Sequence, residues 1–141
     1  MTQEDKELLI KDLCARFPYG VKCKSKYFNG DILQGIIIDD DNTLFNFSIN
    51  DSGFITQLYI SEFKPYLFPL SSMTEKQKKE APFETSLLNS FLNGYIYLFE
   101  KGELTINDVN RMYNWLLKNH FDIFGLIPKG LAIDATNLNI Y

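Results

Sequence analysis

The spacing of apolar residues changes along this chain from a helical period to an alternating one, and later returns to the helical period. At the N-terminus the apolar positions recur at three- and four-residue intervals, as on one face of a helix. These positions are Leu9, Ile10, Leu13, Cys14 and Phe17. Thr2 and Asp5 are placed to form a capping box, and Pro18 and Gly20 are placed to end the helix. The pattern therefore predicts an N-terminal helix in which Cys14 is a small buried residue.

From residue 21 apolar and polar residues alternate, which is the period of a β-strand with one solvated face. The predicted strands are residues 21–27, 31–38, 44–49 and 54–60. Asn29 and Gly30 are predicted to form a two-residue hairpin turn, because both residue types accept a positive φ. Short turns between all the strands predict an antiparallel meander, which is either an open sheet or a small SH3-like barrel.

The segment 63–70, FKPYLFPL, combines two prolines with five large apolar residues. Proline cannot donate to the hydrogen-bond ladder of a sheet, so this segment is not predicted to be a central strand. We expect an extended crossing that covers an edge of the core. Tyr66, Phe68 and Pro69 are its candidate anchors for a partner protein, provided that their side chains are exposed.

Helical patterns return in the second half of the chain. Thr74 and Gln77 are placed to cap a short charged helix, and Thr105 and Asp108 are placed to cap the last helix. The apolar stripe of the last helix consists of Val109, Met112, Tyr113, Leu116, Leu117 and then His120. Residues 86–100 fit a helical stripe, although their GYIYLF stretch also suits a strand; a helix is favoured.

The predicted fold class is therefore α+β, with an N-terminal helix, a four-stranded antiparallel meander and a helical C-terminal half. The 141 residues suit one domain, with a β-rich part at 1–70 and a helical part at 74–141. Hydrophobic residues make up 45% of the chain, which is enough for a core and argues against disorder. The net charge of -4 differs from the strongly basic balance of a general nucleic-acid binder.

Targeting and metal-binding signals do not emerge from the sequence. The N-terminus is acidic where a secretory signal peptide is basic, and no stretch reaches the ~18 apolar residues of a membrane span. Cys14 and Cys23 match neither a disulfide framework nor a zinc knuckle. The DDDN stretch at residues 39–42 lacks the later glycine and glutamate of a calcium loop and is predicted to be a turn. We therefore expect a cytoplasmic protein without a metal, a cofactor or a membrane anchor.

Residues with catalytic chemistry do not form a motif. His120 ends an apolar stripe in a last helical turn, where the helix dipole favours a cationic ring, and this structural role is favoured over a general base. Asp122 is predicted to turn or cap the chain as it reverses at Gly125, and Pro128 suits the first turn of a short helix. The GLIPKG stretch, residues 125–130, lacks the Lys-Ser/Thr pair that completes a phosphate-binding loop. The chain is therefore predicted not to be an enzyme.

Lys22, Lys24 and Lys26 are predicted to share the solvated face of the first strand. A row of ammonium groups beside Tyr27 and Phe28 can follow a phosphate backbone or an acidic protein face. The alternative is that these lysines lie on an edge strand and prevent aggregation between sheets. Because the whole chain is acidic, the alternative is favoured, and we expect no retention on nucleic acid at physiological salt.

Three segments carry a resemblance to a known family: QEDKELLIKDLCARFPYGVK near the start, KPYLFPLSSMTEKQK in the middle and NHFDIFGLIPKGLAIDA near the end. They resemble a family of short uncharacterised proteins encoded in gut anaerobic bacteria and in their phages and integrated elements, with a C-terminus of the type HFDxxGLIPKGLAIDA. An arginine often precedes the first glycine of that pattern, where this chain has Phe124. The resemblance implies a compact cytoplasmic accessory protein, and it brings no activity, cofactor or catalytic residue that can be assigned to this chain.

Three functions compete on this basis. The leading hypothesis is a non-enzymatic protein-interaction or accessory module of a phage or mobile element, and an exposed aromatic patch would support it. The second is a nucleic-acid-binding or regulatory protein that uses the lysine strand, and a clustered basic face would support it. The third and least favoured is an enzyme whose acidic residues meet only on folding, in a deep cleft.

Overall fold

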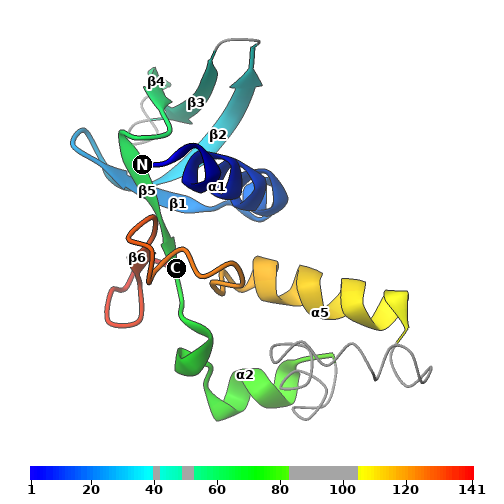
Figure 1. Ribbon diagram of the computed structural model, residues 1–141. Helices are drawn as coiled ribbons and strands as arrows, with labels where there is room; N and C mark the ends of the chain where they lie inside the picture. The colour runs from blue at the N-terminus through cyan, green and yellow to red at the C-terminus, as the bar shows by residue number, and fades with distance from the viewer. Residues whose placement is uncertain (40–41, 49–52, 83–104) are drawn as a thin grey trace.

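The computed structural model describes residues 1–39, 42–48, 53–82 and 105–141 (Figure 1). Helix α1 (Gln3–Arg16) precedes an open, mostly antiparallel sheet, and helices α2 (Glu75–Glu80) and α5 (Ile106–Lys118) follow. The predicted α+β class is confirmed. The sheet has six strands in the order β4-β3-β2-β1-β5-β6 and is not closed, so the alternative of an SH3-like barrel is wrong for the described part of the chain.

The meander of four antiparallel strands is confirmed, with small changes at the ends. Its strands are β1 (Lys22–Ser25), β2 (Asn29–Ile38), β3 (Thr43–Ser48) and β4 (Ile55–Tyr59). The predicted turn at Asn29 and Gly30 is wrong, because the chain already reverses at residues 26–27, where the Ser25 N–H donates to the Phe28 carbonyl at 3.0 Å. Gly30 lies instead at a β-bulge in β2, where its φ of 96° requires a glycine.

The segment with two prolines contains a strand, contrary to the prediction. β5 (Phe63–Leu67) pairs antiparallel with β1 on one side and parallel with β6 (Ile133–Asp134) on the other. Pro65 lies opposite Cys23, and β6 pairs only with Tyr66 and Leu67. The proline therefore borders a strand on one side alone, and that is how a sheet accommodates a residue without an N–H.

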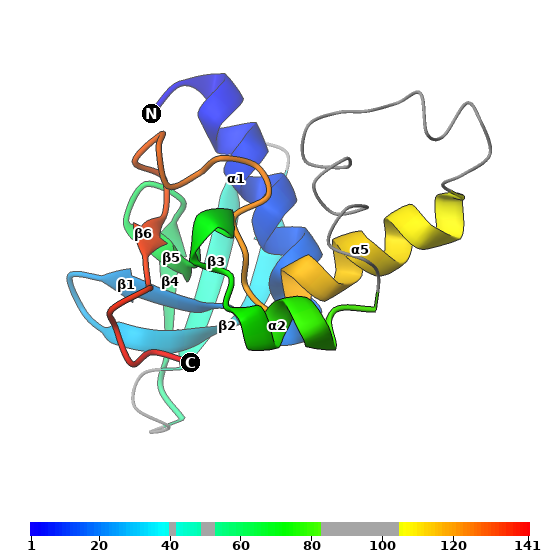
Figure 2. The ribbon, with the colours of Figure 1, turned by 90° about the horizontal axis from the view of Figure 1, so that it is seen from below.

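Helix α1 covers one face of the sheet, and the C-terminal segment lies near β1 and β2 on the other side (Figure 2). The capping box of Thr2 and Asp5 is confirmed: the Asp5 N–H donates to Thr2 Oγ1 and the Thr2 N–H donates to Asp5 Oδ2, both at 3.1 Å. The buried positions of the helix are Leu9, Asp12, Leu13 and Arg16. Cys14 is exposed, so its predicted burial is wrong. The apolar pattern also predicted that Phe17 faces the core, but the charged residues Asp12 and Arg16 are buried there instead.

The core between α1 and the sheet is rich in aromatic rings. The ring centroids of Phe28 and Phe47 are 4.6 Å apart, and those of Phe47 and Phe63 are 4.9 Å apart. Leu9 and Leu13 belong to the same buried cluster. Edge-to-face and tilted ring pairs of this kind stabilise a core beyond the area that they bury.

The predicted caps of the later helices are also confirmed. Thr74 with Gln77 and Thr105 with Asp108 form capping boxes at α2 and α5. On α5 the buried residues are Met112, Leu116 and Leu117. The predicted helix at 86–100 lies outside the described residues. No helix in the described ranges is long and apolar enough to cross a membrane.

After α5 the chain returns to the sheet as β6. The reversal at Gly125 is confirmed, with a φ of 70°, and the Asp122 carboxylate accepts the N–H groups of Leu126 and Ile127, both at 2.8 Å. Asp122 is therefore the turn residue that the sequence predicted. The short helix expected at Pro128 is wrong, because residues 126–130 form turns instead.

Candidate functional site

The aromatic and proline residues predicted as partner anchors are largely covered by the rest of the protein. Tyr66 is only 2% exposed, and its hydroxyl hydrogen-bonds to Asn29 Oδ1. Phe68 is half-buried between the rings of Phe121 and Tyr141, and Pro69 is half-buried as well. The condition set for these anchors, free exposure, is therefore not met by Tyr66.

Tyr141, the last residue, closes this part of the molecule. Its hydroxyl donates to the Tyr66 carbonyl at 2.9 Å and accepts the Lys22 N–H at 3.0 Å. Its ring stacks on His120, with centroids 3.8 Å apart and planes 12° apart. Burial raises the pKa of the Tyr141 hydroxyl well above its ordinary value, so this residue is a neutral structural anchor.

His120 is neutral rather than the cation that its place near a helix end suggested. Its φ of 60° is left-handed, and the His120 and Phe121 N–H groups donate to the Leu117 and Leu116 carbonyls at 3.0 Å. This is a Schellman motif with histidine in the usual glycine position. Burial, together with the charges of Arg16 and Lys22, lowers its pKa to about 4. Nδ1 has no hydrogen-bond partner among the described residues, so the geometry supports a structural residue and supplies no catalytic pair.

A buried ion pair, which the sequence analysis missed, joins α1 to the end of α5. Arg16 Nε and Nη2 donate to the two Asp12 carboxylate oxygens at 2.7 and 2.8 Å, and Nη2 also donates to the Phe121 carbonyl at 2.6 Å. Burial raises the pKa of Asp12, against the effect of the Arg16 hydrogen bonds. The signal in the sequence was an acid and a base four residues apart on the buried face of a helix.

The three lysines of the predicted row, Lys22, Lys24 and Lys26, do not form one row of exposed ammonium groups along β1. Lys22 is half-buried, and its Nζ donates to the Ile140 carbonyl at 2.5 Å. Lys26 lies beyond the end of β1, with Nζ 4.7 Å from the centre of the Tyr27 ring. β1 lies inside the sheet, so the alternative that these lysines protect an edge strand is wrong. β1 lies inside the sheet because β5 pairs with it on the side opposite β2.

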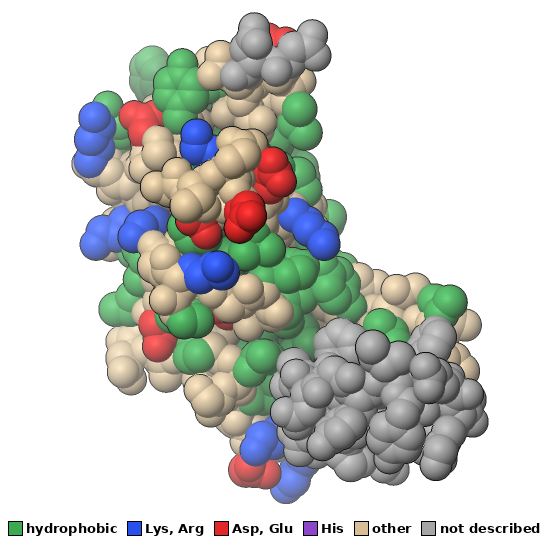
Figure 3. Space-filling view, viewed as in Figure 1, with side chains coloured by type: hydrophobic (Ala, Val, Ile, Leu, Met, Phe, Trp, Pro, Cys, Tyr) green, Lys and Arg blue, Asp and Glu red, His purple; other side chains and the backbone are tan. Residues whose placement is uncertain are grey.

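Two of the three lysines of the predicted row, Lys24 and Lys26, line a basic pocket together with Lys64 of β5, whereas Lys22 is not among its described lining residues. Lys24 and Lys64 lie directly opposite each other on neighbouring strands, and both are exposed. With Lys26 they line an open pocket of about 360 Å³. Figure 3 shows Lys and Arg side chains over the β1–β2 turn and the neighbouring strands. Glu62 also lines this pocket, so its described lining carries three basic side chains and one acidic one. Like charges at opposing positions of a sheet repel, and an anion bound here would reduce that repulsion.

Strand β4, an outer strand of the sheet in the described part of the chain, carries exposed apolar side chains. Leu58 faces the core under α1, so Ile55, Gln57 and Tyr59 point to the opposite, outer face of the sheet. Ile55 is 64% exposed and Tyr59 is 52% exposed. Tyr59 is in register with Leu44 of β3, which is in register with Ile37 of β2. We call the five residues Ile37, Leu44, Ile55, Gln57 and Tyr59 the β4 surface.

The backbone of β4 is only partly occupied along this edge. The Tyr59 N–H donates to Glu62 Oε2 at 2.8 Å, and the Tyr59 carbonyl accepts the Glu62 N–H at 2.9 Å. Alternate residues of a strand direct their backbone groups to opposite sides, so those of Ile55 and Gln57 also point away from β3. No described residue pairs with them. With respect to the described residues, the outward backbone groups of Ile55 and Gln57 are therefore available for hydrogen bonds.

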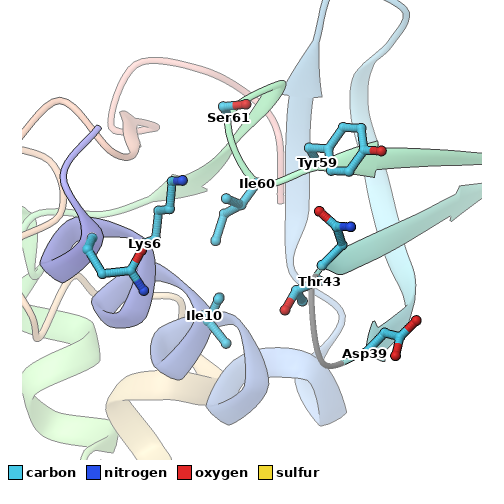
Figure 4. Close-up of a pocket in the computed structure, with 9 residues that line it drawn as sticks. Lys6, Ile10, Asp39, Thr43, Tyr59, Ile60 and Ser61 are labelled. Atoms are coloured by element: carbon cyan, nitrogen blue, oxygen red, sulfur yellow. The ribbon is translucent and has the colours of Figure 1, made fainter.

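An open cleft of about 400 Å³ lies between α1 and the ends of β3 and β4 (Figure 4). Its lining residues are Gln3, Lys6, Ile10, Asp39, Asn42, Thr43, Tyr59, Ile60 and Ser61. Among the described lining residues Asp39 is the one carboxylate, and none is a histidine or a cysteine, so this part of the lining does not bring acids together. Tyr59 belongs both to this lining and to the β4 surface, which makes the two features continuous.

Metal binding has no support in the described ranges, where no group of three or more His, Cys, Asp or Glu side chains is placed to hold an ion. No family model, curated protein or solved structure matches the chain. The resemblance to proteins of gut bacteria and their phages stays a prediction. The geometry of the described residues is therefore the basis for a function.

Proposed function

We propose that this chain is a non-enzymatic protein-interaction module that binds its partner at the β4 surface. The observation that carries the proposal is the exposure of Ile55 and Tyr59 on an edge strand, ITQLY, that has no charged residue. Natural edge strands are usually protected by lysines, prolines or covering segments, because unprotected ones pair with other chains. Among the described residues, Glu62 at the end of β4 is the one that protects this edge.

The neighbouring geometry suits a protein partner. Ile37, Leu44 and Tyr59 extend the apolar character from the edge across three strands, on the face that α1 does not cover. A partner strand would gain backbone hydrogen bonds at the edge and bury apolar area on the outer face. The cleft beside Tyr59 is large enough for one inserted side chain. As an accessory protein of a phage or mobile element, the module would act in the cytoplasm without a cofactor.

Affinity capture from the native host tests this proposal. Ile55→Glu places a charge in the β4 surface, and Ile106→Glu is a matched control because Ile106 is 65% exposed on α5, against 64% for Ile55. We expect wild type and Ile106→Glu to retain the same partner, and Ile55→Glu to lose it. Retention of that partner by Ile55→Glu would contradict the proposal.

The basic pocket favours a second candidate, a nucleic-acid-binding protein. Lys24 and Lys64 oppose each other, and Tyr27 beside Lys26 offers a ring for base stacking. The net charge of -4 opposes this function, so we expect no retention on single- or double-stranded nucleic acid at physiological salt. Micromolar, salt-sensitive binding that Lys24→Gln with Lys64→Gln abolishes, and that Lys118→Gln does not, would replace the leading proposal.

A further inference from the structure

We infer that the occupant of the β4 edge is a second copy of this chain, paired antiparallel about a two-fold axis at Thr56. The inference rests on the proposed function, because it names the partner of the same surface. It follows from the available backbone groups of the edge, from the side chains that each register would bring together, and from the charge of the strand.

The available backbone groups select the register. In an antiparallel pair, the residues whose backbone groups point outward exchange hydrogen bonds with their counterparts. Glu62 occupies both groups of Tyr59, and among the described residues nothing pairs with the outward groups of Ile55 and Gln57. Centring the pair on Thr56 places Ile55 opposite Gln57 of the second copy, and Gln57 opposite Ile55 of the second copy. Both available residues of each chain are then bonded. Centring it on Gln57 would place Ile55 against the occupied Tyr59.

The side chains agree with this register. Thr56 would lie beside Thr56 of the second copy, and threonine pairs across strands are favourable. On the outer face, Ile55 would lie diagonally beside Ile55 and Tyr59 of the second copy, within reach of a large side chain. The exposed apolar area of the edge is thereby buried against the same kind of area.

Charge favours a second copy over an unrelated chain. Residues 53–60, GFITQLYI, contain no charged side chain, so two copies of a protein with a net charge of -4 can meet here without opposing like charges. Charged groups are what usually guide a different partner to its site and fix its register. On β4 the register would instead be fixed by the outward backbone groups of Ile55 and Gln57, which no described residue occupies, and by the occupied groups of Tyr59.

Disulfide trapping in a Cys14→Ser background tests the register. Thr56 and its counterpart would form a non-hydrogen-bonded pair with Cα atoms about 4.5 Å apart, which suits a disulfide. Cys23 is buried and does not compete. We expect Thr56→Cys to give an oxidised dimer that reductant dissolves, and Gln57→Cys to give at least several-fold less. Stronger trapping of Gln57→Cys, or none by either variant at any concentration, would overturn the inference.

The mass in solution tests the second copy without a cross-link. We expect light scattering on a size-exclusion column to show a wild-type mass that rises with concentration from monomer to dimer. Gln57→Pro removes an outward N–H and keeps the bonds to β3, so it should remain a monomer with wild-type circular dichroism. If that variant does not fold, Ile55→Glu serves in its place, with Ile106→Glu as the dimerising control.

The outcomes separate the inference from the proposed function. A wild type that stays monomeric at all concentrations overturns the second copy. If such a monomer still captures a host protein that Ile55→Glu loses, the proposed function stands and the edge belongs to a different protein. If the monomeric wild type captures no host protein, both the inferred second copy and the proposed function are contradicted.

Discussion

His120 has a left-handed backbone, with a φ of 60°, and a buried ring stacked on Tyr141. The sequence placed it correctly at the end of an apolar stripe, but it predicted a cationic ring bonded to helix carbonyls. That prediction was wrong because the ring lies under the C-terminal residue, which is distant in sequence. Local spacing reveals a helix end, whereas the charge of a side chain depends on what covers it.

The protonation of His120 should oppose folding at acidic pH. Folding lowers its pKa from 6.5 to about 4, so the unfolded state binds more protons between these values and stability falls as pH falls through them. We expect His120 to contribute a loss of up to about 3 kcal/mol between pH 7 and pH 4. Asn also accepts this φ, so denaturant unfolding of wild type and His120→Asn should differ in this pH slope. Equal slopes would show that the folded ring titrates normally.

The elements themselves were predicted well wherever the signal is local. All the capping boxes at Thr2, Thr74 and Thr105 are present, because a cap depends on two residues three apart. β5 was missed because its pairing with β1 is a long-range contact, and because Pro65 borders a strand on one side alone. The burial of Asp12 and Arg16 was missed for a similar reason: a charged pair was assumed to face water.

The Asp12–Arg16 pair should matter most when only one partner is removed. Arg16→Met leaves a buried carboxylate without its partner, and such changes cost about 3–5 kcal/mol. Asp12→Leu with Arg16→Met leaves no buried charge, so we expect the double variant to be more stable than Arg16→Met alone. Denaturant unfolding at neutral pH gives both values. A double variant that is no more stable than the single one would show that the pair itself stabilises the fold.

On the scale of the whole molecule, sheet order decides which surfaces are free. The sequence predicted four meander strands, but not that β5 and β6 extend the sheet beyond β1, which leaves β4 as an outer strand in the described part of the chain. The predicted anchor Tyr66 is covered by the C-terminus, while Ile55 and Tyr59, which looked like ordinary strand residues, are exposed. The exposure of these side chains depends on the order of the strands in the sheet and on which segments cover them. The spacing of residues within one strand does not reveal either.

Amide hydrogen exchange on β4 tests the central claim most directly, because it separates outward from inward backbone groups. Thr56 and Leu58 direct their N–H groups to β3, so they should be protected at every concentration. The amides of Ile55 and Gln57 point outward and should exchange quickly in the free protein. We predict that they become protected when the partner binds, whether that partner is a second copy or a captured host protein. Unchanged fast exchange of Ile55 and Gln57 in the complex would contradict the account.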